Sequence, residues 1–63
     1  MKELMEWLNS LPHGQREAQL ARLALAADVT TSTLRRYAKG LREPRPRVRK
    51  IILNFIKKEE GKR

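Results

Sequence analysis

Apolar residues recur along the chain at spacings of three and four, the period of an amphipathic helix, and no segment alternates as a β-strand would. Helices are predicted over residues 2–10, 15–27 and 31–39, with a fourth from residue 46 or 47. Their apolar stripes are Leu4, Leu8 and Leu11; Leu20, Leu23, Ala24 and Ala27; Leu34 and Tyr37; and Val48, Ile51, Ile52, Phe55 and Ile56. The pattern predicts an all-α fold in a single compact four-helix domain spanning residues 1–63, with 57–63 as a frayed, charged tail.

Residues between the stripes mark where the helices end and begin. Pro12 and Gly14 follow the first stripe and stop that helix, since proline lacks a backbone N–H. Asp28 ends the second helix, because aspartate is a poor helix former and tolerates left-handed backbone. Thr30 can cap the third helix through its hydroxyl, and Gly40 is typical of the residue that follows a helix end. The chain is therefore expected to turn sharply between the second and third helices.

Positive charge is concentrated in the second half of the chain. Residues 1–34 hold three bases and four acids, a net charge of −1, whereas residues 35–63 hold twelve bases and three acids, a net charge of +9. This asymmetry indicates a polyanionic partner, and nucleic acid is the usual one. The alternative is a solvated basic surface, but the bases begin inside the third predicted helix rather than in a tail.

Length and composition narrow the function classes. A chain of 63 residues without cysteine has room for one thin core and forms neither disulfides nor thiolate metal sites. No apolar run approaches the roughly 18 residues of a membrane span, and the acidic N-terminal segment does not resemble a signal peptide, so a cytoplasmic protein without a membrane partner is expected. His13 is the single histidine, and paired carboxylates and a glycine-rich phosphate loop are missing. We therefore expect no enzyme activity, metal, cofactor or small-molecule ligand.

Residues 20–39 carry the pattern of two short helices joined by a tight turn. The geometry needs a small residue where the helices cross, and Ala24 occupies that position. Val29 supplies an apolar plug for the corner, and Leu34 and Tyr37 supply the buried side of the second helix. This pattern resembles the helix-turn-helix of the small phage Cro and repressor proteins and their XRE-like relatives.

The resemblance extends more loosely through residues 45–47, which are similar to the basic, proline-containing loop before the fourth helix of those proteins. One departure is Asp28, which stands where the family has its usual turn glycine. If that backbone is left-handed, the substitution costs about 1 kcal/mol. The resemblance implies sequence-specific binding of double-stranded DNA by a small transcriptional repressor of phage or mobile-element origin. It also implies a place at the nucleoid of a bacterial cell or phage-infected host.

The resemblance also assigns roles to polar residues, with helix 31–39 in the major groove. The expected base-reading residues are Thr31, Ser32, Arg35 and Arg36. The expected phosphate contacts are Gln15, Arg16, Gln19, Lys39, Arg42, Arg45 and Arg47. Arg35 could bond two acceptors of one guanine, whereas free backbone N–H groups at the start of the second helix favour a phosphate. Each of these side chains could instead be part of a solvated surface.

A homodimer on a palindromic operator is expected, because one short helix discriminates weakly among sequences. The dimer could be weak in solution or form only on DNA. Its surface is predicted on the fourth helix, with Leu53 and Ile56. The sequence does not decide whether Trp7 lies in the core, contacts a second subunit or is partly exposed. The other functions considered are a helix-turn-helix that binds a protein, such as an antitoxin or modulator, and a basic RNA-binding module. A membrane-surface helix is disfavoured, since the apolar stripe of the fourth helix is needed for the core.

Overall fold

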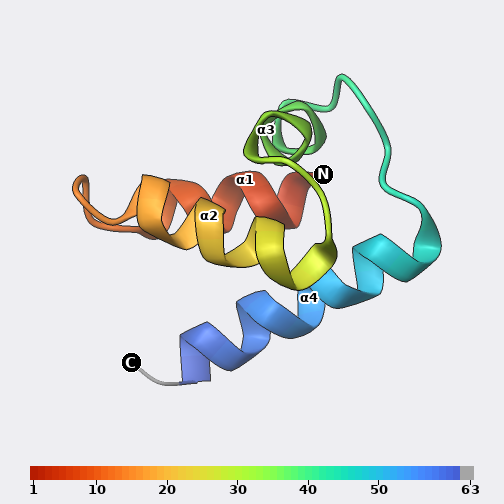
Figure 1. Cartoon of the computed structure of the whole chain (residues 1–63). Helices are drawn as coiled ribbons and strands as arrows, with labels where there is room; N and C mark the ends of the chain where they lie inside the picture. The colour runs from red at the N-terminus through yellow and green to blue at the C-terminus, as the bar shows by residue number, and fades with distance from the viewer. Residues whose placement is uncertain (62–63) are drawn as a thin grey trace.

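The structure, a computed structural model, describes residues 1–61, which form four α-helices and no strand. These helices are α1 (Lys2–Ser10), α2 (Arg16–Ala27), α3 (Thr31–Ala38) and α4 (Pro46–Gly61) (Figure 1). The predicted all-α fold is confirmed, and α1 to α3 and the start of α4 agree with the predicted boundaries to within one residue. None of these helices combines the length and the apolar character needed to cross a membrane.

The helices are arranged around the pair formed by α1 and α2. Figure 1 shows α3 on one side of this pair and α4 on the other, with a loop over residues 39–45 joining them along the edge. Both α3 and α4 pack against α1 and against α2. As a result, α3 leaves one of its faces clear of the rest of the fold.

The core is built from leucine and isoleucine side chains contributed by all four helices. Leu4, Leu23, Leu34 and Ile52, one from each helix, are completely buried. Burying such a side chain contributes roughly 1.5–3 kcal/mol, so each of these four positions matters for the stability of a small domain. Pro44 of the loop is also buried, which the hydrophobic pattern does not predict.

Trp7 belongs to this core and is 2% exposed. Its ring meets that of Phe55 edge to face, with centroids 5.8 Å apart and planes at 82°. Ile56 is 7% exposed and lies in the same cluster. The predicted use of Ile56 as a dimer surface is therefore wrong, because α4 turns this residue towards α1 and α2 rather than outward, and a subunit contact through Trp7 is excluded for the same reason.

The end of the chain differs from the frayed tail that was predicted. Residues 57–61 continue α4, and the Glu59 side chain, 15% exposed, pairs with Arg22 of α2 at 3.7 Å. This contact joins the last turns of α4 to α2. The other two residues of the predicted tail, Lys62 and Arg63, lie outside the described residues.

Candidate nucleic-acid interface

A tight turn separates α2 from α3. Asp28, which was expected to tolerate left-handed backbone, adopts it, with φ 56° and ψ 46°. Across this turn the backbone N–H of Val29 donates to the carbonyl of Ala24 at 3.0 Å. Val29 is half-buried against the core, so it fills the corner as expected. The turn redirects the chain, and in Figure 1 α3 is seen along its axis while α2 lies across the view.

Both ends of α3 are held by hydrogen bonds. At the start, the Oγ1 atom of Thr30 accepts from the backbone N–H of Thr33 at 3.1 Å, which confirms the predicted cap. At the other end, Gly40, with φ 77°, donates through its N–H to the carbonyl of Tyr37 at 3.1 Å. The amine of Met1 donates to the same carbonyl. These bonds satisfy groups that a helix end leaves free, and they fix α3 as a rigid element.

One face of α3 is buried and the opposite face is exposed. Leu34, Tyr37 and Ala38 are buried in the core, as predicted for the first two. The exposed positions repeat at helical spacing and are Ser32, Arg35, Arg36 and Lys39. Thr31, predicted to read bases, is half-buried at the start of the helix. The exposed face therefore presents three cations and one hydroxyl to the solvent.

A shallow hollow of about 220 Å³ lies beside the exposed face, between α3, α1 and α2. Arg16, Glu17, Arg35 and Lys39 form its charged rim, and its apolar wall includes Leu20 of α2. Within this rim, the Oε1 atom of Glu17 accepts from the Nη2 atom of Arg35 at 2.5 Å. The structure thus brings Arg16, Arg35 and Lys39 to one side of α3, together with one carboxylate.

Arg47 lies beside the turn that precedes α3. A second hollow, of about 380 Å³, is lined by Arg47 in the first turn of α4 and by Asp28 and Val29 of the turn that precedes α3. Arg42 and Arg45 are exposed on the loop between α3 and α4. The predicted phosphate contacts are consequently not gathered at one place. Arg16 and Lys39 line the hollow beside α3, Arg47 lies by the turn before α3, and Arg42 and Arg45 are on the loop after it.

Gln15 and Gln19 are not brought into either group. Gln15 is the exposed N-cap residue of α2, and its side chain makes no capping hydrogen bond. Gln19 is half-buried, and its Oε1 atom is buried without a partner among residues 1–61. Gln19 shares a side of α2 with Arg22, which pairs with α4. Neither Gln15 nor Gln19 lines the hollow beside α3, so their predicted phosphate contacts stay predictions.

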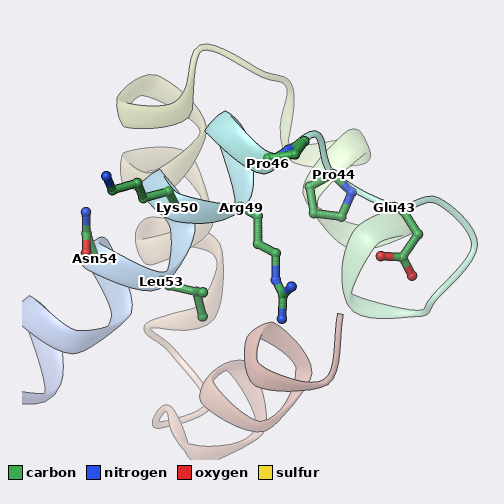
Figure 2. A pocket seen from close by; sticks show the side chains of 7 residues that line it. All are labelled: Glu43, Pro44, Pro46, Arg49, Lys50, Leu53 and Asn54. Atoms are coloured by element: carbon green, nitrogen blue, oxygen red, sulfur yellow. The ribbon is translucent and has the colours of Figure 1, made fainter.

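Another hollow lies on α4 and does not gather charge at one point. Its volume is about 430 Å³, and its lining residues come from α4 and the preceding loop (Figure 2). Figure 2 shows Arg49 reaching towards α1, while Lys50 and Asn54 point away from Glu43. The side chain of half-buried Leu53 forms part of the apolar lining of this hollow. These side chains diverge, so this hollow is not a built site for a small ligand.

The side chain of Arg49 forms an ion pair with a residue of α1. Its Nη2 atom donates to Oε2 of Glu3 at 3.0 Å. A hydrogen bond from the backbone N–H of Glu3 and this bond from Arg49 lower the pKa of the Glu3 carboxyl below its usual value. The ion pair is exposed, so it contributes little to folding, but it ties α4 to α1 on the side away from α3.

Residues 1–61 contain no cluster of three or more histidine, aspartate or glutamate side chains that could hold a metal ion. His13 is exposed in the loop between α1 and α2. The charged residue of this rim that the sequence pattern does not single out is Glu17. The one available signal was its position as the acid in the first turn of α2.

Comparison with known proteins adds no family to this description: no protein-family model, no curated protein and no solved structure matches the chain.

Proposed function

We propose that this protein binds double-stranded DNA sequence-specifically, with α3 in the major groove, and acts as a small transcriptional repressor. The observation that carries the proposal is the exposed face of α3, where Arg35, Arg36 and Lys39 project at helical spacing. The opposite face is anchored by buried Leu34 and Tyr37. A rigid, capped helix with a free cationic face suits insertion between two phosphate backbones.

The dimensions of α3 support this placement. With its side chains, an α-helix is about 10–12 Å in diameter. The major groove of B-DNA is also about 12 Å wide. Arg16 and Lys39 beside α3, and Arg47 beside the turn that precedes it, are cations that could meet the phosphates on the walls of the groove. Such contacts fix the orientation of the helix without reading sequence.

The remaining polar residues then divide by role. Ser32, Arg35 and Arg36 face outward from α3 and are the proposed base-reading side chains, together with half-buried Thr31 at the start of the helix. The proposed phosphate contacts are Arg16, Lys39, Arg42, Arg45 and Arg47. The net charge of +9 over residues 35–63 supplies the sequence-independent attraction to DNA.

A second copy of the chain completes the proposal, because a single 8-residue helix reads few bases. Two copies on a palindromic site would place their α3 helices about 34 Å apart, one turn of DNA. We place this dimer on α4, where Leu53 is one of the partly exposed apolar residues. The dimer could form in solution or only on the operator.

Selection of binding sites from random duplexes tests the proposal. We expect an enriched palindromic motif and an affinity that falls steeply with salt concentration, since each neutralised phosphate adds about 0.9 to the logarithmic slope. Absence of an enriched motif would contradict sequence-specific recognition. Equal competition by duplex RNA would favour the basic RNA-binding module, and negligible binding to any nucleic acid would favour a protein partner.

A further inference from the structure

Glu17 is the one acidic side chain in the rim of the hollow beside α3, where Arg16, Arg35 and Lys39 supply the cations. Its contact with Arg35 joins the first turn of α2 to α3 across 18 positions of sequence. The two side chains are 75% and 47% exposed. Exposed pairs of this kind contribute little to stability, so the pair does not owe its place to the folding of the domain.

The pair leaves Arg35 able to bind a base. A guanidinium carries five N–H donors in a planar fork, and Arg35 uses its Nη2 atom for Glu17. Enough donors remain for the two acceptors on the major-groove edge of a guanine. Glu17 also restricts a long side chain that would otherwise lose more freedom on binding.

The pair also makes Arg35 a poorer ligand for phosphate. Attraction to the backbone depends on net charge, and the carboxylate offsets the charge of the guanidinium while being repelled by phosphates. A contact with a base edge depends on where the N–H donors of the guanidinium are positioned. It is therefore less sensitive to the reduced net charge of the pair. The pairing therefore weakens Arg35 as a general phosphate contact more than as a reader of bases.

We infer that Glu17 is a positioning residue that holds Arg35 for a guanine and away from the phosphate backbone. It acts through Arg35 rather than through a contact of its own. This inference rests on the proposed function, since it assigns the specificity of that same interface.

The test compares two variants that each remove one negative charge. Glu17→Gln breaks the pair, whereas Glu6→Gln removes an exposed charge that lines a hollow between α1 and α4. For each variant, affinity is measured for the selected duplex and for a scrambled duplex over a range of salt concentrations. Glu17→Gln should strengthen binding to the scrambled duplex, steepen its salt slope by about 0.9 as Arg35 gains a phosphate, and lower the specificity ratio about tenfold. Glu6→Gln should leave the ratio unchanged.

The same substitution in an Arg35→Ala background separates positioning from direct contact. There, Glu17→Gln should not change the specificity ratio further. An equal loss with and without Arg35 would overturn the inference, because Glu17 would then act on DNA by itself. An unchanged ratio in the single variant, with a wild-type protein that still discriminates, would overturn the inference and leave the proposed function standing. A wild-type protein that discriminates between no sequences would overturn both.

Discussion

The N–H of Val29 and the carbonyl of Ala24 meet at 3.0 Å across Asp28, whose backbone is left-handed. This bond sets the direction in which α3 leaves α2, and therefore which of its faces remains free. A residue other than glycine in that conformation costs about 1 kcal/mol, less for aspartate than for most side chains. The turn on which the proposed interface depends is thus formed against a local backbone preference.

The left-handed backbone of Asp28 should determine which substitutions at this position are the more stable. Because glycine accepts left-handed backbone freely, Asp28→Gly should be more stable than Asp28→Ala by about 1 kcal/mol. At exposed Ala26, inside α2, alanine should instead be the more stable residue. Ala26→Gly should lower the free energy of unfolding by about 1 kcal/mol. Urea denaturation followed by circular dichroism measures both. The same order at both positions would contradict a left-handed Asp28.

The cap of α3 should also be measurable. Thr30→Ala removes the hydroxyl that accepts from the Thr33 N–H and should lower the free energy of unfolding by about 1 kcal/mol. Ser32→Ala, on the exposed face of α3, should change it by less than about 0.5 kcal/mol. Thermal denaturation of the two variants gives the comparison, and equal losses would remove the special role of Thr30.

Local features of this fold were predictable from the sequence, whereas contacts between distant segments were not. The helices, the Thr30 cap and the backbone of Asp28 follow from spacing and from the preferences of single residues. The Glu17–Arg35 pair depends on how α2 and α3 are placed in space, and no local pattern encodes that placement. Ile56 shows the same limit, because the stripe on α4 does not reveal how far around the helix the core extends.

Burial separates two leucines that look alike in a helix. Leu34 of α3 is completely buried and Leu25 of α2 is 84% exposed. Leu34→Ala should lower the free energy of unfolding by about 2–5 kcal/mol, as truncations of buried leucines do. This is a large share of the stability of a domain this small. Leu25→Ala should change stability by less than about 0.5 kcal/mol. Comparable losses in urea denaturation would mean that α3 does not pack as described.

Removal of proposed phosphate contacts should act on all DNA sequences alike. Arg45→Ala together with Arg47→Ala should weaken binding to selected and scrambled duplexes equally and lower the salt slope by about 1.8, twice the value for one contact. Lys57→Ala with Lys58→Ala removes the same charge from exposed positions near the other end of α4 and should lower the slope less. Binding titrations over salt distinguish the two pairs, and identical slopes would remove Arg45 and Arg47 from the interface.

The Glu3 contact should appear in the pH dependence of stability. Because the pKa of Glu3 is lowered in the folded protein, its contribution is present above the unfolded value and is lost as the pH falls through the folded one. Glu3→Gln should therefore destabilise the protein at neutral pH and have no effect in acid. Arg49→Gln removes one of the two hydrogen bonds and should give a smaller change of the same sign. Urea midpoints at several pH values test this, and a pH-independent difference would contradict it.

Trp7 is the one tryptophan of the chain and lies edge-on to Phe55, so the first and last helices meet at an intrinsic fluorophore. Its emission should shift to longer wavelength when α4 separates from α1, without any added label. The indole faces the α4 side of the fold, away from the cationic face of α3. Loss of the α1–α4 contact can therefore be followed optically, in the presence or absence of nucleic acid, for every variant described above.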